Sequence, residues 1–149
     1  MKCYECGASM REGSVEHTFT ISGVKVRGKM PAMICPECGE NTVASDALGA
    51  LELMAAHALG QHAVRTPEVF KFMRKALGLR AVDVCELLGT DPATVSRWER
   101  GHLDVDRHAF ALLAALVEDR VLGKTSTEER LRRLANPPKV YPRELELTA

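Results

Sequence analysis

Four of the five cysteines form two short repeats, and their spacing constrains the fold more than any other feature of this 149-residue chain. Cys3 and Cys6 are separated by two residues, Cys35 and Cys38 have the same separation, and a glycine follows each pair. Two thiolates at this spacing reach a single ion if the backbone between them curls back, and the glycine tolerates the positive φ of such a curl. The four sulfurs therefore predict one tetrahedral metal site.

Zn²⁺ is the ion that this ligand set favours, because zinc takes four thiolates and brings no redox chemistry. Its binding would also contribute folding energy to a segment too small to build a large core. Two alternatives remain open, namely iron in a rubredoxin-like site and a thiol redox centre. Since four thiolates saturate the ion, we expect the metal to be structural and the protein not to be an enzyme.

The segment between the cysteine pairs has the pattern of a β-hairpin. Apolar and polar residues alternate up to Ile21, Ser22-Gly23 supplies a turn, and a second alternating run follows. The second run carries a basic stripe of Lys25, Arg27 and Lys29, which either faces a partner or is simply solvated. Two cysteine turns joined by a hairpin predict a zinc ribbon over residues 1–44.

Helical periodicity dominates the remainder of the chain. We expect a helix capped by Ser45 and ending near Gly60, within a linker and hinge at residues 45–65. A domain follows at residues 66–123, in which the signals that begin and end helices are regular: Thr66-Pro67, Gly78, Gly89, Asp91-Pro92 and Gly101. Residues 124–149 are expected to form a short helix, opened by a capping box at Ser126, and an extended tail.

Two short helices of the 66–123 domain, about Ala81 to Leu88 and Pro92 to Arg100, are separated only by a tight turn. Such a turn forces the second helix to cross the first steeply, as in a helix-turn-helix. Cys85 falls at the crossing, where we expect a small core residue and not a metal ligand. Four apolar side chains are expected to fix the crossing angle: Val84, Leu88, Val95 and Trp98. The predicted fold class is α+β, with a small N-terminal zinc ribbon and β-hairpin followed by an all-α repressor-like domain.

A further helix is expected after Asp104, and it carries more apolar side chains than one small bundle easily buries. It forms either the seam of a dimer or an internal core helix. The apolar side chains concerned are Phe110, Leu112, Leu113, Leu116 and Val117.

The runs Lys75–Leu79 and Val95–Gly101 strongly resemble the Cro/repressor (XRE) class of helix-turn-helix domains. The order of a two-pair cysteine ribbon followed by this domain resembles the MqsA/YgiT family of antitoxins from bacterial toxin-antitoxin pairs, over about Met1 to Val121. The resemblance implies a homodimer that binds a palindromic operator in double-stranded DNA, represses its own operon and holds a ribonuclease toxin with its zinc domain. The alternative is a stand-alone transcription regulator whose ribbon only docks proteins, with no toxin.

Several side chains of the predicted helix-turn-helix are candidates for contact with DNA. A recognition helix enters the major groove by its N-terminal residues, here Ala93 and Thr94, and Arg97 follows one turn later. Arg97 can donate two hydrogen bonds to a guanine, the contact that best uses its planar guanidinium. Contacts with backbone phosphates are expected from Ser96, Arg100, Arg80 and His102.

Two positions depart from the resemblance. Ala81 stands where this class often has a glutamine that touches phosphate, and Ala93 stands where the MqsA-like recognition helix has an asparagine. Arg74 and Glu99, in contrast, match positions at which the class often holds an internal ion pair.

Composition adds two constraints. Lysines plus arginines number 20 and aspartates plus glutamates number 20, so any positive field that attracts DNA is local. The sequence has neither a long apolar stretch nor the apolar centre of a secretory signal, which predicts a cytoplasmic protein without a membrane partner.

Overall fold

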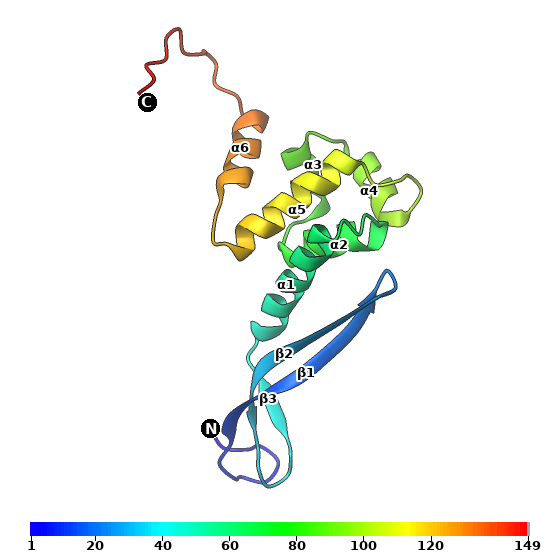
Figure 1. The fold of residues 1–149 in the computed structure, drawn as a ribbon, viewed down its shortest axis with the longest axis vertical. Helices are drawn as coiled ribbons and strands as arrows, with labels where there is room; N and C mark the ends of the chain where they lie inside the picture. Colours follow the sequence, from blue (N-terminus) through cyan, green and yellow to red (C-terminus); the bar gives the residue numbers. More distant parts are fainter. Residues whose placement is uncertain (149) are drawn as a thin grey trace.

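The computed structural model describes residues 1–148 and has the predicted α+β architecture (Figure 1). Within those residues, a three-stranded antiparallel sheet with a four-cysteine cluster precedes six helices. The strands are β1 (Arg11–Ile21), β2 (Val24–Ile34) and β3 (Asn41–Val43). The helices are α1 (Ala47–Gln61), α2 (Pro67–Ala76), α3 (Ala81–Leu88), α4 (Pro92–Arg100), α5 (Arg107–Val121) and α6 (Ser126–Ala135). Figure 1 shows the two termini at opposite ends of an elongated molecule.

Strands β1 and β2 form the predicted hairpin and pair along their whole length, from Arg11 opposite Ile34 to Ile21 opposite Val24. The turn residues Ser22 and Gly23 have φ of 49° and 76°. Positive φ at both positions gives the turn whose twist matches that of a two-residue hairpin. The pattern did not predict β3, which pairs only with residues 32–34 of β2. The rest of β2 therefore has β1 as its only strand partner within residues 1–148.

The region predicted as a linker is part of the helical core. Helix α1 begins at Ala47 with Asp46 as its N-cap, so the predicted cap at Ser45 is wrong. The helix packs against α2 and α5. Gly60 permits close approach to α5, because a Cβ at this position would lie 3.1 Å from the Cβ of Ala114. The domain boundaries at 44, 65 and 123 stay predictions. The segment 45–65 is packed against the helical domain through α1.

The predicted helix ends in the second half of the chain are confirmed. The Thr66 side chain accepts a hydrogen bond from the backbone N–H of Val69, and Asp91 does the same for Thr94, so both residues cap their helices. Gly89 and Gly101 end α3 and α4 in the left-handed conformation. These caps leave a short turn between α3 and α4, as the spacing predicts.

Helices α2 to α5 enclose one hydrophobic core. Phe70 of α2 meets Trp98 of α4 edge to face, with ring centroids 5.7 Å apart. Cys85 is buried with 6% of its surface exposed, which confirms it as a core residue. Of the side chains expected at the crossing, Val84, Val95 and Trp98 are buried. Leu88 is only half-buried, and the neighbouring Leu87 is the buried leucine of α3.

The far end of the hairpin packs onto this helical core. The rings of Phe19 and Phe72 lie 5.8 Å apart, and Ile21 is buried in the same cluster as the helices. The Ser22 backbone N–H donates to a Glu68 carboxylate oxygen at 2.8 Å. The Ser22 and Thr66 hydroxyl oxygens lie 2.6 Å apart. Sheet and helices thus share one core. The contacts between the hairpin tip and α2 join the two sides of the predicted hinge.

Helix α5 is an internal core helix. It begins at Arg107 with Asp106 as the N-cap, two residues later than Asp104. Its apolar side chains are covered by the same chain, with Leu112 half-buried and the others buried: Phe110, Leu113, Leu116 and Val117. The interpretation of these residues as a dimer seam therefore has no exposed apolar face to support it.

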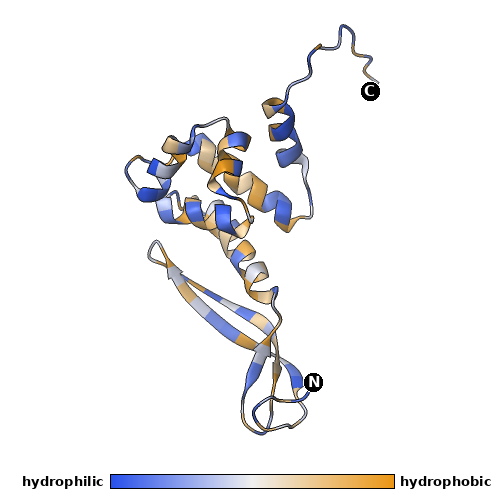
Figure 2. Ribbon diagram, turned by 180° about the vertical axis from the view of Figure 1, so that it is seen from behind, coloured by the Kyte–Doolittle hydropathy of each residue, from blue (hydrophilic) through white to orange (hydrophobic). Residues whose placement is uncertain are grey.

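Helix α6 is confirmed where the sequence predicts it, but its N-cap is Thr125 and not a capping box at Ser126. The Asp119 carboxylate accepts hydrogen bonds from Ser126 and Thr127 and so attaches α6 to α5. Figure 2 shows a mostly hydrophilic α6 beside a largely hydrophobic α5. None of the helices within residues 1–148 is long and apolar enough to cross a bilayer.

Candidate metal centre and nucleic-acid interface

The two cysteine turns repeat the same backbone geometry. The N–H of Gly7 donates to the carbonyl of Cys3 at 2.9 Å, and that of Gly39 to the carbonyl of Cys35 at 3.0 Å. Both glycines have positive φ, 74° and 77°, which an L side chain rarely adopts. The first cysteine of each pair also donates its own N–H to a carbonyl beyond the turn, that of Ala8 or of Glu40, at 2.8 Å. The sequence repeat therefore encodes two matching loops that face each other.

The four cysteine sulfurs meet in one cluster and can bind a metal ion. All four lie within 4.8 Å of one another, with Sγ–Sγ distances of 3.6 Å for Cys3–Cys38 and 3.4 Å for Cys6–Cys35. Four ligands about 2.3 Å from a tetrahedral ion are about 3.8 Å apart, so the cluster fits such an ion. The separations are far longer than the roughly 2.05 Å of a disulfide, and all five cysteines are free.

The electrostatics of the cluster favour a bound cation. Backbone N–H groups, first that of Cys38, hydrogen-bond to the Cys35 sulfur and lower its pKa to about 7. The N–H of Glu40 acts in the same direction on Cys38, but the adjacent Cys35 and Cys3 thiols and desolvation outweigh it and raise the pKa of Cys38 to about 12. Adjacent thiols therefore do not all ionise together on their own. A divalent cation among them would stabilise the deprotonated form of all four thiols.

Helix α4 presents an exposed face with two arginines. Ala93, Arg97 and Arg100 recur at helical spacing and are all exposed, whereas Val95 and Trp98 on the other side are buried. The helix is thus fixed by its apolar side and free on its polar side. This is the placement that base contacts in a major groove require.

The other side chains predicted to contact DNA differ in burial and in the partners they already have. The Thr94 hydroxyl donates to the Asp91 carboxylate at 2.8 Å, so this proton is already committed within the cap. Ser96 is half-buried, and His102 is exposed just beyond the end of α4. Arg80 is exposed at the N-cap of α3, away from α4 in sequence. Contacts of these residues with DNA stay predictions.

Two ion pairs near this face have different roles. The Arg74 guanidinium donates to both carboxylate oxygens of Glu99, and the two side chains are only 12% and 11% exposed. This pair joins α2 to α4, as the resemblance implies. Arg80 instead pairs with Asp83 at 2.9 Å on the surface, and this contact lowers the pKa of the Asp83 carboxyl. A phosphate would therefore compete with Asp83 for the Arg80 side chain.

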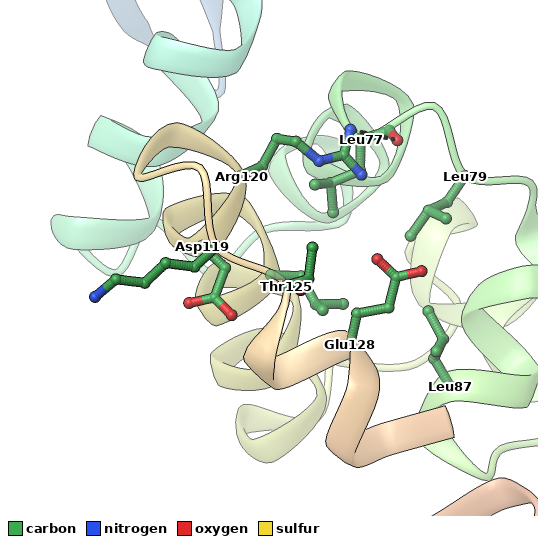
Figure 3. Close-up of a pocket in the computed structure, with 9 residues that line it drawn as sticks. Leu77, Leu79, Leu87, Asp119, Arg120, Thr125 and Glu128 are labelled. Carbon is green, nitrogen blue, oxygen red and sulfur yellow. Dashed lines mark hydrogen bonds between the residues drawn. The ribbon is translucent and has the colours of Figure 1, made fainter. Parts of the chain in front are cut away.

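A small pocket lies where α2, α3, α5 and α6 meet (Figure 3). Leucines line one part of it, and its two carboxylates already have partners in the protein. Asp119 accepts from Thr127 at 2.8 Å, and Glu128 pairs with Arg132 at 2.7 Å. With both carboxylates committed in this way, we assign no ligand to this pocket.

Comparison with known proteins identifies the helical part of the chain. Residues 70–116, from α2 into α5, match the helix-turn-helix family HTH_3, which is of the XRE type. No curated protein sequence matches the chain. The match covers the helices whose caps and crossing are described above. It supports a DNA-binding regulator of the XRE family.

Proposed function

We propose that this protein is a sequence-specific transcriptional repressor that inserts α4 into the major groove of DNA. The observation that carries the proposal is the exposed Ala93–Arg97–Arg100 face on a helix whose other side is fixed by Val95 and Trp98. Arg97 recognises a guanine edge with two hydrogen bonds, and Arg100 contacts the phosphate backbone. Neither role needs an excess of positive charge over the whole chain.

The repressor acts as a homodimer on a palindromic operator. Two-fold symmetry places two recognition helices about 34 Å apart, one turn of DNA, so that each meets an identical half-site. The four-cysteine cluster holds one structural Zn²⁺, which fixes the two cysteine loops against each other. Repression takes place in the cytoplasm, where the sequence predicts the protein to be.

The finer proposal is that the repressor is the antitoxin of a type II toxin-antitoxin pair and neutralises a ribonuclease toxin through its zinc ribbon. Its support is the order of a four-cysteine hairpin domain followed by an XRE domain, together with the protrusion of the cysteine end away from the helices (Figure 1). The test is expression of the adjacent reading frame alone and with this protein. Growth arrest relieved by co-expression supports an antitoxin, and the absence of arrest leaves the stand-alone regulator.

The repressor proposal is tested by selecting bound fragments from a random pool of duplex DNA with the full chain. We expect an inverted repeat whose half-sites are about 10 base pairs apart from centre to centre. A pool without enrichment, obtained with folded and metal-loaded protein at modest ionic strength, would exclude sequence-specific binding. Reporter repression from the selected operator then separates a repressor from an activator.

A further inference from the structure

One edge of β2 is open along a groove. Strand β3 covers only residues 32–34 of β2, and a groove of about 560 Å³ runs beside the uncovered part. Four consecutive residues, Val24 to Arg27, line one wall, and α1 supplies the other with Ala55, Ala58 and Leu59. Because alternate side chains of a strand point to opposite faces, a groove lined by consecutive residues faces the edge of the strand. Such an edge accepts another strand.

The groove has a defined end. At Gly28 a Cβ would collide with the side chain of Leu51 of α1, so strand and helix are in close contact there. The open edge is therefore about four residues long. Along it, Val24 and Val26 alternate with Lys25 and Arg27. Both basic side chains are exposed, and Arg27 also pairs with Glu16 at 3.5 Å on the surface of the hairpin. A complementary strand needs apolar side chains at every second position and acidic ones between them.

The C-terminal segment of this chain has that pattern. Residues 144–147 read Glu-Leu-Glu-Leu, and Leu145 and Leu147 are 72% and 89% exposed. After Asn136, none of the residues that the structure describes takes part in a hydrogen bond. Large apolar side chains this exposed are otherwise scattered, and several gather in this tail. A solvated, alternating apolar segment is typical of a strand without its sheet.

We propose that the Glu144–Leu147 segment of a second copy adds as a strand to the open edge of β2, and that reciprocal exchange of these segments forms the dimer. The two leucines pack beside Val24 and Val26 in the groove, and the two glutamates lie beside Lys25 and Arg27. Backbone hydrogen bonds extend the sheet. This inference deepens the proposed function, because it supplies the dimer contact that the buried face of α5 does not.

The arrangement of the helices favours a second copy over the same chain as the source of the segment. The tail leaves from α6, which packs on α3 and α5, while α1 lies between α5 and β2. Figures 1 and 2 both show the tail pointing away from the sheet. A tail from the same chain would have to pass around α5 and α1. A two-fold partner presents its tail to the groove directly and receives one in return.

The first test measures the mass of the full metal-loaded chain in solution by light scattering over a concentration series. We expect a dimer that the double variant Leu145→Asp/Leu147→Asp weakens by about tenfold or more, because the buried leucine surface is lost. Val140→Asp, at another exposed apolar position of the tail, is the matched control and leaves the dimer intact. On the groove side, Ala58→Arg weakens the dimer, and Ala111→Arg on exposed α5 surface does not.

The second test exchanges charges. Lys25→Glu and Glu146→Lys each weaken dimerisation by about fivefold, and the combined variant recovers most of the loss. All variants are first shown to keep the thermal stability of the wild type. A monomeric wild type overturns the proposal. Tail and groove variants that are as dimeric as their controls also overturn it. A monomer whose tail protects its own β2 edge from amide hydrogen exchange also overturns it.

Binding to a duplex with a single half-site is measured in parallel, because it needs no dimer. A wild type that is monomeric but binds the half-site refutes this inference alone. A stable dimer that binds no duplex refutes the proposed function alone. If the tail variants remain dimeric but bind DNA less tightly, the segment contacts nucleic acid, and the strand exchange is again refuted.

Discussion

The arginines of the helix-turn-helix differ in whether they already form an ion pair with a carboxylate. Arg74 and Arg80 are paired with Glu99 and Asp83, whereas Arg97 has no ion-pair partner within residues 1–148. A free planar guanidinium on an exposed helix face retains all its donors for a base edge. This freedom, which Arg100 shares among the described residues, supports the role in base recognition that we propose for Arg97.

Replacement of Arg97 tests this assignment. Arg97→Ala should cost about 1 to 3 kcal/mol of binding to the selected operator and much less on random DNA, measured by fluorescence anisotropy. Arg100→Ala is the comparison, since a phosphate contact weakens both duplexes alike and lowers the salt slope by about one. Equal losses on both duplexes for Arg97→Ala would show that it does not recognise bases.

The Arg74–Glu99 pair should affect the stability of the domain and not its contact with DNA. Glu99→Leu leaves the largely buried Arg74 charge without a partner and should lower the free energy of unfolding by about 3 kcal/mol in urea titrations. Arg74→Met/Glu99→Leu removes both charges and should recover much of that loss. If the double variant is no more stable than Glu99→Leu, the unpaired Arg74 charge is not the cause of the loss.

At the scale of single elements, the cap of α4 has a pH dependence. The Thr94 hydroxyl and backbone N–H donate to Asp91 and lower the pKa of its carboxyl. A lowered pKa in the folded state means that the stabilisation is complete above the unfolded value near 4 and is lost as the pH falls through the folded value. The cap should therefore stabilise α4 equally at pH 5 and pH 7.

We expect Asp91→Asn to retain an acceptor at the cap while it removes this titration. The melting temperature of the variant should fall less steeply than that of the wild type between about pH 4 and pH 2. Circular dichroism at 222 nm follows the transition. Identical slopes for the two proteins would assign the acid sensitivity to other carboxylates, such as Asp106, whose pKa is also lowered, chiefly by the N–H of Ala109.

Local elements were predictable because their signals are local. The cysteine loops, the hairpin turn and the caps at Thr66 and Asp91 depend on residues a few positions apart, and all agree with the structure. The identity of the buried leucine in α3 was not predictable, since Leu87 and Leu88 are adjacent and both apolar. Only the packing of neighbouring helices decides between them.

Contacts between distant segments were beyond the sequence pattern. Strand β3 has three residues, too few for alternation to be recognised. The contact of Ser22 with Glu68 joins residues 46 positions apart and has no local signal. The open β2 edge was also hidden, because a strand pattern does not show which neighbours the strand has. The basic stripe was visible, but whether a partner covers it was not.

For the whole molecule, metal removal should affect more than the ribbon. Cys35→Ser removes one of the four cysteines of the cluster, so we expect loss of the bound metal ion and disorder of the cysteine loops. Since Phe19 and Ile21 of the hairpin pack on the helices, the melting temperature of the helical domain should fall as well. Cys85→Ala is the control and should retain the metal ion, because Cys85 lies outside the cluster. A helical transition unchanged in Cys35→Ser would show that the hairpin tip stays docked without metal.

The attachment of the hairpin tip to α2 also fixes a direction. One end of the long two-stranded ribbon is fastened beside the first helix of the DNA-binding domain, and the sulfur cluster lies at the other end. A protein bound at the sulfur cluster would therefore stand at a set height and angle above the double helix. The length and twist of this rigid hairpin, rather than the reach of a flexible linker, would decide which neighbouring molecules fit on the same stretch of promoter.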